Sequence, residues 1–118
     1  MADCIFCFIA SGDLEATVVA ESDTAVAFRD QSPAAPVHVL VVPREHHESA
    51  AEMARVDAQG VADLFALVGE VARGEGVETT GYRVLTNVGA DAGQEVAHLH
   101  LHVVGGGPLG ALLSRPRG

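Results

Sequence analysis

Residues 96–104 read Val-Ala-His-Leu-His-Leu-His-Val-Val. This alternation predicts a β-strand in which His98, His100 and His102 share one face, while apolar residues pack on the other face. Same-face neighbours on a strand are about 6.6 Å apart, so the outer two histidines would be about 13 Å apart. Because zinc binds its ligands at about 2 Å, one ion could not reach both of them. The three histidines are therefore expected to have at least two different roles.

A histidine row of this kind suits phosphoryl or nucleotidyl transfer. The simpler interpretation, a solvated polar face of a sheet, fits a single histidine better than three, because histidine is not enriched in strands. A neutral imidazole can attack phosphorus, and a neighbouring imidazolium can neutralise phosphate oxygens or protonate a leaving group. The preceding stretch, residues 87–94, contains glycines that allow close backbone approach and amide side chains that can donate hydrogen bonds. We therefore expect it to form a phosphate cradle.

The rest of the chain predicts an α+β fold with a mainly antiparallel sheet. Apolar residues recur with the helical period over residues 57–74, which predicts an amphipathic helix that ends at Gly74 or Gly76. A shorter helix of one or two turns is expected over residues 4–10, before a Ser-Gly-Asp turn. Strands are predicted over residues 17–21 and 24–29, which form a hairpin, and over 37–42, 82–88 and 96–104.

Length and composition indicate one globular domain. The chain has 118 residues, is 48% hydrophobic and carries a formal net charge of −9. We expect a single domain over residues 1–118, with residues 109–118 as a C-terminal tail. The acidic balance argues against binding to nucleic acid, and no apolar run approaches the roughly 20 residues that span a membrane. The N-terminus lacks the basic region of a secretory signal, so the expected location is the cytoplasm.

The two cysteines, Cys4 and Cys7, form a C-x-x-C pair. Without secretion, metal binding or redox chemistry is a better interpretation than a disulfide scaffold. One such pair supplies half of a tetrahedral zinc site, so two further ligands must come from elsewhere. The candidates are His46 and His47, which follow a predicted strand, and His98. The alternative is a pair of reduced, buried thiols beside surface histidines.

The chain resembles the histidine triad (HIT) superfamily, and within it the Hint branch. The motif is His-x-His-x-His followed by two apolar residues, and residues 98–104 carry it in full. The resemblance extends from residue 4 to about residue 106 and includes the segments Cys4-Ile5-Phe6-Cys7, Ala27-Phe28-Arg29-Asp30, Ala35-Pro36-Val37-His38, Leu40-Val41-Val42-Pro43-Arg44 and Gly93-Gln94-Glu95-Val96. It implies a HIT-like fold with a five-stranded sheet, one long helix and one or two short helices, and a sheet continued across a homodimer.

The resemblance also implies an activity: hydrolysis at the α-phosphate of purine nucleoside phosphoramidates, with AMP or GMP as ligand. His100 corresponds to the nucleophile that forms a nucleotidyl-histidine intermediate. The other implied catalytic histidines are His102, which contacts the phosphate and relays a proton, His98, the first of the triad, and His38. The implied nucleotide contacts are Phe6 and Ile9 at the base, Asp30 beside Gln31 at the ribose, and Asn87, Gly93, Gln94, Glu95 and the backbone of Val96 near the phosphate and ribose.

Taken alone, several of these residues have simpler interpretations. Asp30 would begin a turn, and Phe6, Ile9 and His38 would belong to the core. The resemblance further selects His46 over His47, and so implies a structural zinc site of Cys4, Cys7, His46 and His98.

Two departures from the Hint pattern affect the expected substrate. Glu95 stands where many Hint proteins carry serine, and the C-terminal segment lacks a Trp-Pro-Pro ending. A carboxylate beside a phosphate is repulsive, so the expected contact of Glu95 is its backbone N–H. The missing Trp-Pro-Pro ending leaves the leaving group open. The alternative functions are a diadenosine polyphosphate hydrolase or phosphorylase, whose motifs usually place glutamine at the third triad position, and a non-catalytic module that binds a nucleotide or zinc.

Overall fold

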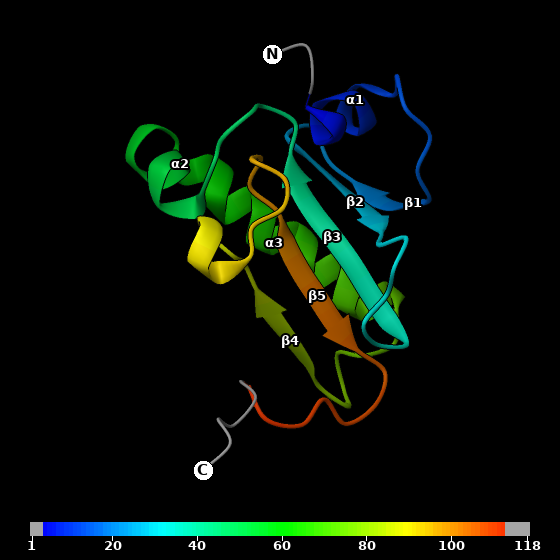
Figure 1. Cartoon of the computed structure of the whole chain (residues 1–118). Helices are drawn as coiled ribbons and strands as arrows, with labels where there is room; N and C mark the ends of the chain where they lie inside the picture. The colour runs from blue at the N-terminus through cyan, green and yellow to red at the C-terminus, as the bar shows by residue number, and fades with distance from the viewer. Residues whose placement is uncertain (1–3, 113–118) are drawn as a thin grey trace.

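The computed structural model describes residues 4–112, and an antiparallel sheet forms its centre (Figure 1). Every neighbouring pair of strands is antiparallel, which confirms the predicted α+β class with five strands. In spatial order the strands are β1 (Val18–Glu21), β2 (Ala25–Arg29), β3 (Val37–Pro43), β5 (Leu101–Gly105) and β4 (Tyr82–Leu85).

One long and two short helices accompany the sheet: α1 (Ile5–Ser11), α2 (Ala50–Val56) and α3 (Ala58–Gly74), with a 3-10 turn η1 (Ala90–Ala92). The predicted long helix is confirmed: the Asp57 side chain accepts the N–H of Gly60 at its start. Helix α2 was not predicted. Its signal was present in the sequence, because the hydroxyl of Ser49 caps it by accepting the N–H of Glu52 at 3.1 Å.

The two faces of the sheet pack against different helices. One set of alternating residues on β2 and β3 packs with α3, which lies behind the sheet in Figure 1: Ala25, Ala27, Val39 and Val41. The other set packs with Phe6 and Ala10 of α1: Val26, Phe28, Leu40 and Val42. His102 pairs directly with Leu40 and therefore lies on the α1 face.

Strand β5 begins at Leu101, later than predicted, because the residue of β3 that would face the predicted start is a proline. In the sheet Leu101 pairs with Val41, and the same register would bring Pro43 opposite Leu99. Proline has no N–H to donate to a ladder. Residues 96–100 therefore run on without strand pairing.

Of the three alternating histidines, only His102 lies in a strand. The prediction that His98, His100 and His102 share one face of a single strand is therefore wrong. Strand β4 is also shorter than predicted and ends at Leu85 rather than residue 88.

Residues 109–112 of the predicted tail contain no helix or strand, and residues 113–118 lie outside the described residues. Within residues 4–112, no helix has the length and apolar character needed to cross a membrane.

Candidate active site and metal centre

A cavity opens beside α1, on the sheet face opposite α3. Its lining includes ten of the residues that the resemblance assigned to nucleotide binding: Phe6, Ile9, Asp30, Gln31, Asn87, Gly93, Glu95, Val96, His100 and His102. The lining also contains residues that were not predicted, among them residues 14–17, Arg29 and Leu40. The sequence of residues 14–17 contains no motif that predicts a place in a binding site. These residues reach the cavity through the packing of α1 on the sheet.

His100 offers a nitrogen lone pair in this cavity. Its Nδ1 lies 2.8 Å from the carbonyl oxygen of His98, which can only accept a hydrogen bond, so Nδ1 carries the proton. The neutral ring then has its lone pair on Nε2. The ring is largely buried, and the Phe6 ring packs edge-on against it with centroids 5.0 Å apart. The arrangement is that of an oriented nucleophile.

His102 carries its proton on the other ring nitrogen, Nε2, for a reason that begins at His38. The backbone N–H of Ala34 donates to Nδ1 of His38 at 2.9 Å, so the proton of His38 is on Nε2. That nitrogen lies 2.9 Å from Nδ1 of His102, which must accept. The neutral His102 ring therefore carries its proton on Nε2, a buried atom without a hydrogen-bond partner in the described residues. His102 lines the cavity, and no described protein group accepts this N–H.

Burial, together with the neighbouring His100 and His38, lowers the pKa of His102 to about 4. The ring is therefore neutral at pH 7.

This pKa makes the stability of the protein depend on pH. Between about pH 6.5 and pH 4 the unfolded chain protonates His102 while the folded chain does not, so stability is complete above this range and falls as the pH drops through it. We expect the wild type to lose up to about 2 kcal/mol more than His102→Gln between pH 7.5 and pH 5.0. Urea unfolding at the two pH values measures this difference, and an equal loss in both proteins would contradict it.

Three residues predicted to act in catalysis or nucleotide binding do not line the cavity: His38, Gln94 and His98, of which His98 belongs to the metal group described below. His38 stands behind His102 and reaches Asp30, whose Oδ2 lies 3.4 Å from its Nε2. The Gln94 side chain binds backbone groups of two loops: it accepts the N–H of Gly89 at 2.9 Å, and it donates to the carbonyl oxygens of Val96 and of Glu48, which precedes α2. Its position makes Gln94 a brace of the loop.

The backbone donors of this loop are fewer than the glycine pattern suggested. The N–H groups of Gly93 and Gln94 are already bonded to Ala90 and Gly89. Those of Glu95 and Val96 have no acceptor within residues 4–112. Both residues line the cavity, so these two N–H groups are candidate donors to a ligand.

Permanent positive charge is scarce around the cavity. Among its described lining residues only Arg29 carries such a charge, and its two terminal nitrogens bind Glu75 at 2.6 and 3.0 Å. Asp30 also has a structural contact, because its Oδ1 accepts the N–H of Ser32 at 2.7 Å, as expected for a residue that begins a turn. An anionic group would therefore be met mainly by N–H donors.

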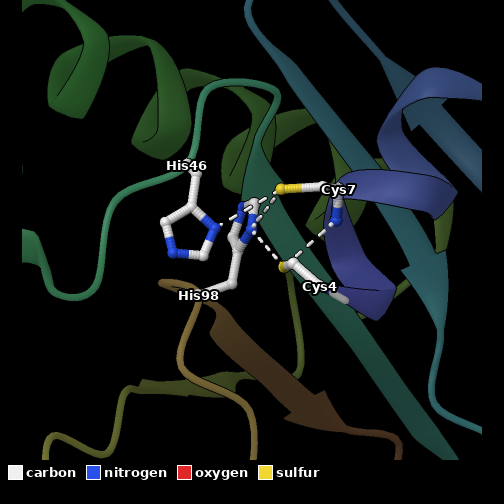
Figure 2. A group of neighbouring side chains, drawn as sticks. All are labelled: Cys4, Cys7, His46 and His98. Carbon is white, nitrogen blue, oxygen red and sulfur yellow. Dashed lines mark hydrogen bonds between the residues drawn. The ribbon is translucent and has the colours of Figure 1, made fainter. Parts of the chain in front are cut away.

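Figure 2 shows a second group, in which Cys4, Cys7, His46 and His98 point toward one another. Their ligand atoms all lie within 4.8 Å of one another. His98 Nδ1 is 3.2 Å from Cys4 Sγ and 3.5 Å from Cys7 Sγ, and His46 Nδ1 is 3.4 Å from Cys7 Sγ. Four tetrahedral ligands of a zinc ion lie about 3.3–3.8 Å apart, so the spacing fits such an ion.

The protonation of His98 also suits a metal ligand. Its Nε2 donates to the carbonyl oxygen of Pro43 at 2.9 Å, which leaves the lone pair on Nδ1, the atom that faces the thiols. Burial lowers the pKa of this fully buried ring, so it is neutral at pH 7. His98 does not line the cavity, which separates it from His100 and His102.

His47, the other candidate ligand, faces away from the thiols. Its ring nitrogens lie 3.0 Å from Glu45 and 3.1 Å from Glu52. Burial by itself would lower the pKa of His47, but the hydrogen bonds to Glu52 and Glu45 raise it above its usual value. The geometry therefore favours His46 over His47 as a metal ligand. The residue pattern without the family resemblance had left this choice open.

Comparison with known proteins identifies the family. Residues 11–109 match the family model described as the HIT domain. The chain belongs to the HIT domain family. Among HIT relatives, the purine nucleoside phosphoramidase of Escherichia coli strain K12 is 34% identical over 110 residues, which are 93% of this chain and 92% of that protein.

Two solved HIT structures are similar in fold. A histidine triad protein from Clostridium difficile has a TM-score of 0.88 and 41% identity, and the match covers 92% of this chain and 95% of that chain. A HIT family hydrolase from Legionella pneumophila Philadelphia 1 has a TM-score of 0.85 and 40% identity, over 90% of this chain and 95% of that chain. These matches confirm the resemblance to the histidine triad superfamily and its fold.

Proposed function

We propose that the chain is a nucleotide hydrolase of the purine nucleoside phosphoramidase type. The observation that carries this proposal is the pairing of an Nε2 lone pair on His100 with an Nε2–H on His102 in one cavity. A nucleophile and a hydrogen-bond donor side by side are what displacement at a phosphate requires. Similarity to the E. coli phosphoramidase and to a HIT family hydrolase supports the reaction class.

In the proposed reaction, Nε2 of His100 attacks the α-phosphorus of AMP or GMP linked to an amine. The phosphorus–nitrogen bond breaks, and the amine leaves with a proton that enters from solvent. His102 carries a proton on Nε2 and donates a hydrogen bond to the phosphate oxygens. Water then attacks the nucleotidyl-histidine, which releases the nucleotide and restores His100.

The nucleotide would lie across the rest of the cavity. The base packs against Phe6 and Ile9, and the ribose hydroxyls bind Asp30 beside Gln31. The phosphate lies near the free N–H groups of Glu95 and Val96. Of the other predicted contacts, Asn87 and Gly93 line the same end of the cavity, and Gln94 supports it through the loop.

The direct test is turnover of an adenosine 5′-phosphoramidate, followed by mass spectrometry of the quenched protein. The expected result is release of AMP and an adenylyl group on His100. Faster turnover of a diadenosine polyphosphate would favour the hydrolase or phosphorylase alternative. Calorimetric binding of AMP without turnover of either substrate would favour a non-catalytic nucleotide module, and no AMP binding would leave only a zinc-binding module.

We also propose that Cys4, Cys7, His46 and His98 hold a structural zinc ion. Two sulfur and two nitrogen ligands form a closed tetrahedral set, which is the arrangement of zinc sites that stabilise a fold. When bound, the ion would tie α1, the loop after β3 and the segment before β5 together. His98 would thereby hold the carbonyl that orients His100.

For partners, we propose a purine nucleotide, no nucleic acid and no membrane, in a cytoplasmic homodimer. A sheet can continue into a second copy only at an edge strand, here β1 or β4. Sedimentation equilibrium separates a dimer from the 12.2 kDa chain.

A further inference from the structure

His47 is a buried histidine that neither the cavity nor the metal group uses. It follows His46 in the loop after β3, and its side chain is 7% exposed. Its Nε2 lies 3.0 Å from Glu45 and its Nδ1 lies 3.1 Å from Glu52. Each ring nitrogen lies within hydrogen-bond distance of a carboxylate, so the ring is held from two sides.

The backbone of His47 is bonded to the triad segment. Its carbonyl oxygen accepts the N–H of Leu99 at 2.6 Å, and Leu99 is the residue between His98 and His100. This segment lacks a strand ladder at the point where Pro43 would be its partner. The carbonyl of Pro43 accepts Nε2–H of His98, and the carbonyl of His47 takes the N–H of Leu99 in its place.

The clamp on the His47 ring is anchored in a helix. Glu52 lies in the first turn of α2 and accepts a second hydrogen bond from the N–H of Glu48 at 3.1 Å. The N–H of Glu52 is in turn bonded to Ser49. Loop and helix are thus held together around the ring, which limits the movement of the His47 carbonyl.

We propose that His47 is a positioning residue for His100. The clamp on its ring holds its carbonyl on Leu99, and this contact holds the carbonyl of His98 that orients Nδ1 of His100. Its effect on turnover rests on the proposed function. Its effect on the backbone at Leu99 and on the ring of His100 does not.

The test compares His47→Leu and Glu52→Gln with the wild type, each as the full chain with its metal content measured. In His47→Leu we expect the Leu99 amide to exchange at least about tenfold faster with solvent, while the amide of Val103 in β5 is unchanged. We expect kcat for an adenosine phosphoramidate to fall by about tenfold or more, with the Kd of AMP within about twofold. In the wild type, the nitrogen-15 chemical shifts of the His100 ring should show the proton on Nδ1 alone. In His47→Leu they should show the proton on both ring nitrogens in turn. Glu52→Gln should change each quantity in the same direction by less.

Met53→Ala is the matched control, because Met53 is buried on α2 and takes no part in the clamp. An equal loss of kcat in Met53→Ala at an equal loss of thermal stability would overturn the proposal, as would an unchanged Leu99 exchange rate in His47→Leu. If His47→Leu does not fold, Glu52→Gln decides by the same criteria. If the wild type has no turnover, the proposed function fails, and the Leu99 exchange and His100 shifts still decide the role of His47.

Discussion

Replacing His100 by alanine should abolish turnover of an adenosine phosphoramidate, with kcat reduced about 10⁴-fold or more. The variant removes the nitrogen that would attack phosphorus, and no second imidazole in the cavity has its lone pair in the same place: Nε2 of His102 carries a proton. Binding of AMP should survive within a few-fold, because the base and ribose contacts lie elsewhere in the cavity. Steady-state kinetics and calorimetry measure the two quantities.

His102→Gln is the matched control for this experiment. Glutamine keeps an N–H donor near the phosphate, so we expect kcat to fall only about tenfold and the adenylyl group on His100 to remain detectable. Near-normal turnover in His100→Ala would refute the nucleophile. A loss of similar size in both variants would show that the two histidines act as one unit, contrary to the roles proposed above.

Replacing Cys7 by serine should remove the metal and destabilise the fold. A zinc site of this kind contributes to folding directly, so we expect bound zinc to fall from about one ion per chain to near zero, and Tm to fall by about 10 °C or more. Cys7 is preferred over Cys4 because the sulfur of Cys4 also caps α1 through the N–H of Cys7. Metal analysis and thermal unfolding of protein prepared without chelator measure the two effects.

A chelator supplies the control. Chelation should lower the Tm of the wild type toward that of Cys7→Ser and leave the Tm of the variant unchanged. Absence of bound zinc in the wild type would end the proposal of a metal site. Unchanged stability after complete removal of zinc would show that packing around the two thiols is sufficient for the fold.

The sequence predicted the regular elements well where the pattern was local. The hairpin of β1 and β2, strand β3 and the long helix α3 all follow from apolar periodicity and turn residues, and each lies within a few residues of its predicted bounds. The short helix α2 was missed although its cap, Ser49 with Glu52, is a local signal. Strand β5 was predicted to begin too early, because its start depends on Pro43, a residue far away in the chain.

The candidate site was likewise predicted in part: its residues could be named from the sequence, but several of their contacts could not. Residue types and their resemblance to a family predicted most of the cavity lining, including Phe6, Asp30 and Glu95. The position of the Gln94 side chain could not be predicted, because three backbone groups hold it and one of them, the carbonyl of Glu48, comes from another loop. The clamp on His47 was also beyond prediction, because glutamates near a histidine in sequence often point to solvent.

By itself, the sequence determined, through its resemblance to the histidine triad superfamily, that this chain has a HIT-like fold, because the motif is carried by neighbouring residues. The expectation that the histidines have separate roles rested on one continuous strand, which the structure does not contain. Only the tertiary structure decided which nitrogen of each ring carries the proton. His98 is set by Pro43, His100 by the turn of the backbone at His98, and His102 by His38 and, behind it, Ala34. An imidazole becomes a ligand, a nucleophile or a donor according to what accepts or donates at its other nitrogen, and most of these partners come together only when distant strands pair.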